Sequence, residues 1–106
     1  MALRLVIKNT TGAKTDLSFG SAQTHDFVVK DADNDLVWRW SHDRAFAQIF
    51  VKKSLRPGAK MTFVSAWDQT TNKNRPAPAG KYRVEAEFLA IGNFAAVGPL
   101  HIEIVK

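Results

Sequence analysis

Alternation of apolar and charged residues with a period of two most constrains what this chain can fold into. It is clearest at residues 81–88, in the order Lys81, Tyr82, Arg83, Val84, Glu85, Ala86, Glu87 and Phe88. Successive side chains of a strand point to opposite faces, so this segment is predicted to be a strand with one buried face. Shorter versions of the same pattern place further apolar residues on shared faces: Leu3, Leu5 and Ile7; Leu17 and Phe19; Met61, Phe63 and Trp67; Leu100, Ile102 and Ile104.

Turn-forming residues separate these segments. Residues 9–12 end the first strand, with Gly12 able to take a positive φ. A polar break at residues 31–35 predicts a hairpin between residues 27–30 and 36–40, and the Pro-Gly pair at 57–58 predicts a tight turn. Residues 45–53 fit either a strand or a short helix, and their β-favouring Ile49, Phe50 and Val51 favour a strand.

About eight short strands without a long helix predict an all-β fold, and we expect an immunoglobulin-like antiparallel β-sandwich. The 106 residues suffice for a single domain spanning residues 1–106. The chain has no cysteine, so the sandwich is predicted to lack a disulfide. No apolar stretch is long enough to span a bilayer, and the N-terminal residues do not resemble a signal peptide.

The net charge of +5 could favour an acidic partner such as nucleic acid. The basic residues, however, are scattered and mostly alternate with apolar ones, which is typical of the solvated faces of strands. We therefore expect no nucleic-acid partner and no membrane association.

Side chains able to perform chemistry are sparse. Ser41, His42 and Asp43 are triad-type residues, but neighbours on an extended chain diverge and cannot converge on one substrate atom. The three histidines lack a metal-ligand spacing, and the six glycines occur singly, without a phosphate-binding loop. We expect no enzyme activity, no cofactor and no metal.

Two tryptophans suggest a binding surface or a core. Trp38 and Trp40 are two residues apart and therefore share a face of the predicted strand. They could stack against a sugar or a single-stranded nucleic acid. The pattern favours the alternative that they fill the core. Trp67 is expected to anchor the polar segment that follows it.

Several stretches together resemble the BsuPI family of bacterial intracellular proteinase inhibitors. They are residues 23–31 (Gln-Thr-His-Asp-Phe-Val-Val-Lys-Asp), 37–41 (Val-Trp-Arg-Trp-Ser), 45–48 (Ala-Phe-Ala-Gln), 55–58, 67–68 and 78–84. The resemblance implies an immunoglobulin-like sandwich that inhibits a cytoplasmic, subtilisin-like serine protease, and we expect a monomer. It implies no reactive-site residue. The alternative is an immunoglobulin-like interaction or structural module without inhibitory activity.

The order of the strands suggests where a protease would bind. If each strand reverses the one before it, one end of the sandwich collects residues 21–24, 42–44 and 68–78. The other end collects residues 10–13, 32–35, 56–58 and 92–97. The first end holds the longest polar loop, residues 68–78, and rigid sandwiches commonly present binding loops in this way. The candidate protease contacts at this end are His42, Asp43, Arg44, Asp68, Asn72, Lys73, Asn74 and Arg75. We expect that grafting Gly-Ser over residues 72–76 weakens inhibition and leaves thermal stability nearly intact.

Overall fold

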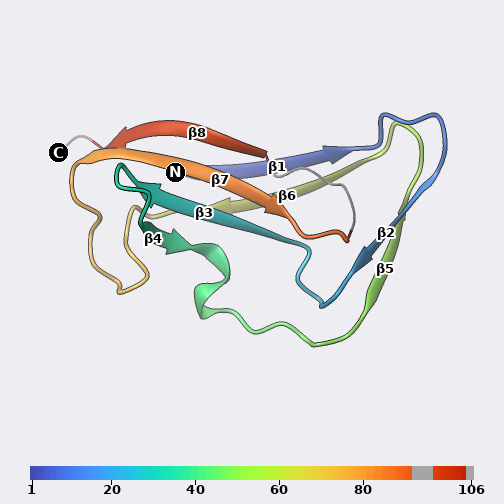
Figure 1. Cartoon of the computed structure of the whole chain (residues 1–106), viewed down its shortest axis with the longest axis horizontal. Helices are drawn as coiled ribbons and strands as arrows, with labels where there is room; N and C mark the ends of the chain where they lie inside the picture. Colours follow the sequence, from blue (N-terminus) through green and yellow to red (C-terminus); the bar gives the residue numbers. More distant parts are fainter. Residues whose placement is uncertain (92–96, 105–106) are drawn as a thin grey trace.

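The computed structural model describes residues 1–91 and 97–104, the latter as backbone (Figure 1). The elements of this part of the chain are β1 (Ala2–Lys8), β2 (Thr15–Phe19), β3 (His25–Asp31), β4 (Leu36–Arg39), the 3₁₀ helix η1 (Trp40–Asp43), β5 (Val51–Leu55), β6 (Lys60–Ala66), β7 (Gly80–Phe88) and β8 (Val97–Ile104). All strand pairs are antiparallel, which confirms the all-β prediction. None of the described residues forms a helix long and apolar enough to cross a membrane.

One layer of the sandwich is a bent two-stranded ribbon. β1 pairs with β6, and the same two chain segments continue around a corner as the pair of β2 with β5. The buried Asn9 holds the corner: its Nδ2 donates to the carbonyl oxygens of Ala13 and Leu55, at 2.9 and 2.8 Å. Its Oδ1 accepts from the backbone and hydroxyl of Thr11. The side chain thus replaces ladder hydrogen bonds where the strands separate.

The other layer is a four-stranded sheet in the order β4-β3-β7-β8. The predicted hairpin at residues 31–35 joins β3 to β4, and Asn34 takes a φ of 67°, which asparagine tolerates better than most residues. At the start of β7 the buried Tyr82 donates its hydroxyl to the carbonyl oxygen of Pro78. A tyrosine bonded to backbone just upstream is a feature of immunoglobulin-like sandwiches, the tyrosine corner.

The core lies between these two layers. It contains residues from the other predicted apolar faces, whereas the side chains of the face predicted at residues 100–104 lie outside the described part of the chain. The buried members of the core are Leu3, Leu5, Leu17, Phe19, Phe27, Val29, Leu55, Trp67, Ala77, Tyr82, Val84, Phe88 and Ala90. Phe63 of β6 reaches across, and its ring centroid lies 6.2 Å from that of Phe88 on β7. The alternating pattern of β7 is observed as predicted, with Tyr82, Val84 and Phe88 buried. This confirms the sandwich prediction.

Two expectations about local structure were wrong. The strand predicted at 45–53 is formed only from Val51 onward, whereas residues 44–50 are irregular because no described strand pairs with them. The assignment of loops to two ends also fails in part, because β2 continues β1 around the corner instead of reversing it. Residues 31–35 lie near residues 71–78, and the opposite end holds residues 21–24, where Thr24 accepts a hydrogen bond from the N–H of Leu89. The predicted loop 92–97 lies largely outside the described residues.

Candidate functional site

The polar segment at residues 68–78 is a small folded hairpin. Thr70 and Pro76 form an isolated bridge, and the N–H of Ala77 donates to the carbonyl oxygen of Gln69 at 2.8 Å. Beneath the hairpin, Nε1 of the fully buried Trp67 donates to the carbonyl oxygen of Thr70 at 2.9 Å. This bond confirms that Trp67 anchors the segment.

Asn72 ties this hairpin to the edge of the four-stranded sheet. Its Oδ1 accepts from the N–H of Arg39 at 2.9 Å, and its Nδ2 donates to the carbonyl oxygen of Arg39. Its own N–H donates to the carbonyl oxygen of Val37. Asn72 therefore satisfies backbone groups on the side of β4 where the described part of the chain places no further strand. Replacing residues 72–76 would break these bonds, so the expectation of nearly unchanged stability does not fit the structure.

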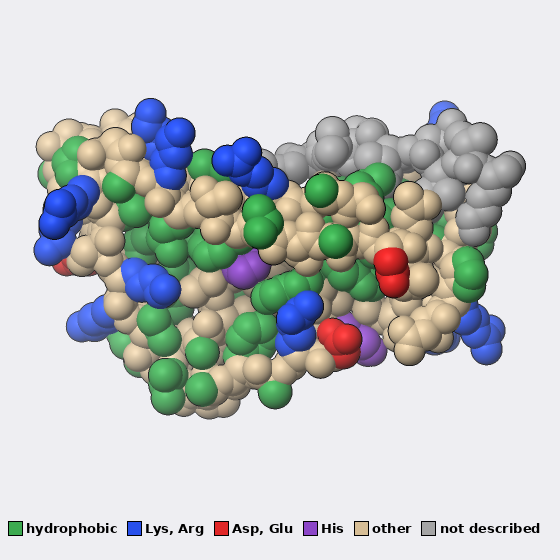
Figure 2. All heavy atoms as spheres, turned by 180° about the vertical axis from the view of Figure 1, so that it is seen from behind, with side chains coloured by type: hydrophobic (Ala, Val, Ile, Leu, Met, Phe, Trp, Pro, Cys, Tyr) green, Lys and Arg blue, Asp and Glu red, His purple; other side chains and the backbone are tan. Residues whose placement is uncertain are grey.

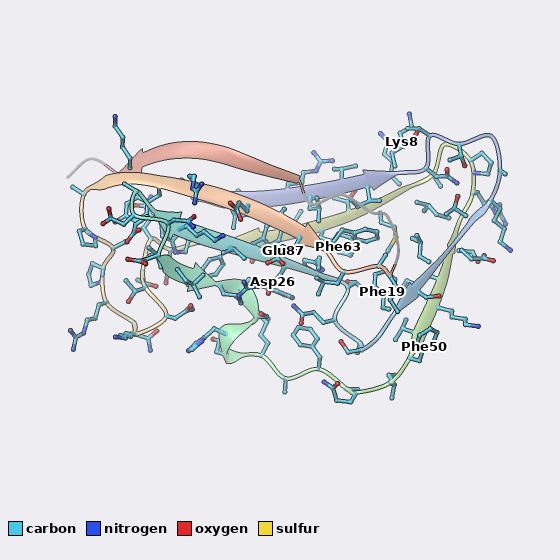
Figure 3. All side chains as sticks on the ribbon, viewed as in Figure 1. Lys8, Phe19, Asp26, Phe50, Phe63 and Glu87 are labelled. Atoms are coloured by element: carbon cyan, nitrogen blue, oxygen red, sulfur yellow. The ribbon has the colours of Figure 1, made fainter. Side chains whose placement is uncertain are left out.

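Helix η1 carries two of the candidate contacts and is held in place by a buried carboxylate. Asp26 on β3 is 2% exposed and accepts from the N–H and hydroxyl of Ser41, the latter at 2.6 Å. Arg39 Nη1 lies 2.9 Å from both Asp26 Oδ2 and Glu87 Oε1. Asp26 and Glu87 are partners across β3 and β7 and lie side by side in Figure 3. Because directly opposed carboxylates repel, Arg39 between them stabilises the sheet and fixes where η1 begins.

These supports bring most of the candidate residues together. The hairpin and η1 enclose a hollow of about 570 Å³, whose lining includes His42, Asp43, Asp68, Asn72 and Asn74. A second hollow of about 630 Å³ lies between the hairpin and β4 and is lined in part by His42, Lys73 and Arg75. Apart from the half-buried Asn72, all of these candidate side chains are exposed. The structure thus collects seven of the eight candidates at one end of the sandwich.

Arg44 is the candidate that lines neither hollow. Its guanidinium lies over the ring of Trp40, 4.4 Å from the ring centroid, and its Nε donates to the carbonyl oxygen of Trp40. Among the acidic candidates, Asp68 accepts a hydrogen bond from the hydroxyl of Thr70, which lowers the pKa of its carboxyl group. Asp68 therefore carries a negative charge beside the hairpin at neutral pH.

A family model for intracellular proteinase inhibitors, BsuPI, matches residues 1–93 of the chain. The chain belongs to the BsuPI family. A search of curated protein sequences found no match. The family description assigns proteinase inhibition to its members and describes them as intracellular.

Most of the residues that carry the resemblance to BsuPI proteins build the fold. Asp26, Arg39 and Ser41 form the network under η1, and Trp38 and Trp40 pack against the core. The two tryptophans are half-buried, with Trp38 next to Trp67 and Trp40 stacked on His25 at 4.6 Å between ring centroids. Their packing agrees with the core interpretation, but Trp40 begins η1 and does not lie on the predicted strand.

The hairpin at residues 31–35 contains the one group of acidic side chains that could hold a cation within the described residues. The carboxylates of Asp31, Asp33 and Asp35 have ligand atoms within 4.8 Å of one another. Asp31 Oδ1 already accepts from the N–H groups of Asp33 and Asp35, so it shapes the turn. Exposed acidic turns of this kind are common without an ion, and the expectation of no metal stays a prediction.

Sequence reasoning missed one surface of this BsuPI domain. Ile49 and Phe50 were assigned to a strand, yet they lie before β5 and are 57% and 60% exposed. The only signal in the sequence was the ambiguity of residues 45–53 between strand and helix. A segment that suits neither well is a candidate for irregular, exposed structure.

Proposed function

We propose that this BsuPI protein inhibits a subtilisin-like serine protease in the cytoplasm and acts as a monomer. The observation that carries the proposal is the family match over residues 1–93, which includes every candidate contact. The hairpin at 68–78 and η1 would form the contact surface. The core holds both in fixed positions, which reduces the ordering cost of binding.

The surface is suited to a protein partner. The hollow between the hairpin and β4 combines apolar lining from Leu36, Pro76 and Pro78 with the exposed charged residues Lys73 and Arg75. Protein interfaces likewise combine apolar and charged side chains. Asn72 would hold the hairpin against β4 and would not contact the protease directly.

The proposal is tested by titrating the purified protein against purified subtilisin while the hydrolysis of a chromogenic peptide is followed. The informative variant reverses two exposed charges, Lys73→Glu with Arg75→Glu. We expect its inhibition constant to rise roughly tenfold, about 1.4 kcal/mol, because these exposed charges would face the enzyme.

A matched control reverses two exposed charges that flank the corner held by Asn9, Lys8→Glu with Lys14→Glu (Lys8 is labelled in Figure 3). It should inhibit like the unmodified protein. Absence of inhibition by the unmodified protein across several subtilisin-type enzymes would refute the function. If both double variants weaken inhibition equally, the proposed location of the contact surface is refuted.

A further inference from the structure

The segment at residues 45–50 connects η1 to β5 along the lower margin of Figure 1, and none of the strands that the structure describes pairs with it. It contains no helix, turn or bend, and Arg44 before it has extended dihedral angles, φ −117° and ψ 144°. Among the described residues, the N–H groups of residues 45–49 have no hydrogen-bond partner. The carbonyl oxygen of Ala47 accepts one bond, from the N–H of Ala22 at 2.9 Å, and that of Phe46 accepts one from Nε2 of Gln48 at 3.5 Å. The main chain here is therefore largely free to pair with another chain.

The segment also exposes large apolar side chains. Ile49 and Phe50 are neighbours and are both more than half exposed. In the view from behind, hydrophobic side chains gather at the lower corner formed by this part of the molecule (Figure 2). Exposed strand edges usually carry lysine or proline, which prevent unwanted pairing. Residues 45–50 contain neither, nor any charged residue.

Both ends of the segment are fixed. At its start, the ring of Phe46 lies 5.9 Å from that of Trp40, and Arg44 covers Trp40 from outside. At its end, Val51 pairs with Phe19 at the beginning of the β2–β5 ladder. A chain held at both ends loses little conformational freedom when it binds, so the segment is already prepared for a partner.

We infer that residues 45–50 enter the substrate-binding cleft of the target protease as an added β-strand, with Ile49 and Phe50 as the apolar anchors; this rests on the proposed function. A serine protease holds an extended polypeptide with one side chain in a specificity pocket beside the reactive serine. Strand addition provides this through main-chain hydrogen bonds together with pockets for side chains. The segment follows directly on His42, Asp43 and Arg44, so it extends the proposed contact surface.

The first experiment compares inhibition constants against purified subtilisin for the variants Ile49→Ser and Phe50→Ser. The matched control is Val64→Ser, because Val64 is 71% exposed on β6. We expect each anchor variant to raise the inhibition constant at least about tenfold, as truncating a central apolar contact does. The control should leave it unchanged. All three variants should keep the melting temperature of the unmodified protein, since the replaced side chains are exposed.

The outcomes separate the two proposals. If the unmodified protein inhibits and both anchor variants inhibit equally well, the inferred strand is overturned and the proposed function stands. If the unmodified protein does not inhibit, the proposed function itself fails.

Hydrogen–deuterium exchange gives an independent readout of the same segment. The amides of residues 45–49 should exchange rapidly in the free protein and at least about tenfold more slowly in the complex with subtilisin. Protection confined to residues 68–78 would overturn the inference. Protection that appears without protease as the protein concentration rises would also overturn it, because a second copy of the chain would then occupy the edge.

Discussion

Replacing Asp26 with alanine removes the acceptor of five hydrogen bonds. The donors are the N–H of Phe27, the N–H and hydroxyl of Ser41, Arg39 Nη1 and Gln23 Nε2. The replacement also leaves Arg39 with Glu87 as its remaining carboxylate partner among the described residues. Because β3, β4 and η1 all meet at this carboxylate, the change tests whether the network holds the sheet edge in place.

The expected loss follows from burial. Removing one partner of a buried ion pair costs roughly 3–5 kcal/mol. The Arg39 side chain is 36% exposed and keeps Glu87, so water screens part of the remaining charge and the loss falls at the lower end. We therefore expect the free energy of unfolding to fall by about 3 kcal/mol. For a domain of this size, that lowers the melting temperature by roughly 12–24 °C.

Urea denaturation followed by tryptophan fluorescence measures this loss. The control is Asp16→Ala, because Asp16 is exposed and accepts one hydrogen bond, from Ser54. Its free energy of unfolding should change by less than about 0.5 kcal/mol. A loss below about 1 kcal/mol for Asp26→Ala would show that the network contributes little, and the reasoning from buried charge would be refuted.

Two further predictions concern the half-buried His25 and the buried Asn9. Burial lowers the pKa of His25, whose Nε2 lacks a hydrogen-bond partner among the described residues and whose ring stacks on Phe63 at 4.2 Å between centroids. Below a pH of about 6.5 the unfolded chain binds more protons than the folded protein, so the free energy of unfolding should decrease as the pH is lowered. His25→Phe should make this decrease smaller in denaturation curves measured from pH 7 to 5. An unchanged slope would contradict this reasoning. Asn9→Ala should lower the free energy of unfolding by about 2–3 kcal/mol, because it removes the hydrogen bond that Asn9 Nδ2 donates to the buried carbonyl oxygen of Leu55. Thermal melts would measure this, and a loss near zero would mean that the corner needs no such support.

The strands with a strict period of two could be predicted from the sequence because one face of each is buried. Tyr82, Val84 and Phe88 follow the predicted pattern for this reason. The path of residues 44–50 could not be predicted, since whether an extended segment becomes a strand depends on a neighbour elsewhere in the chain. The same limit explains the loops assigned to the wrong end. No local pattern reveals that β2 continues β1 around a corner supported by Asn9.

The candidate site could be located only in part. A long polar segment marked residues 68–78, and their proximity to His42 and Asp43 follows from the fold. The role of Asn72 could not be foreseen, because an asparagine in a polar loop has the same local pattern whether it faces solvent or supports β4. The carboxylate of Asp26 was equally inconspicuous. Its partner Arg39 is 13 residues away, and only the β3–β4 hairpin brings the two charges together.

The bent ribbon has a consequence for how the chain folds during its synthesis. β1 pairs with β6, so Ala2 cannot form its strand pair until Ala66 has been synthesised. At synthesis rates of roughly 5–20 residues per second, that delay is about 3–13 seconds. During this interval Leu3 and Leu5 belong to an unpaired, aggregation-prone strand, and the charge of Arg4 between them opposes association with other nascent chains. A residue that contributes nothing to the finished core can therefore protect the protein before that core exists.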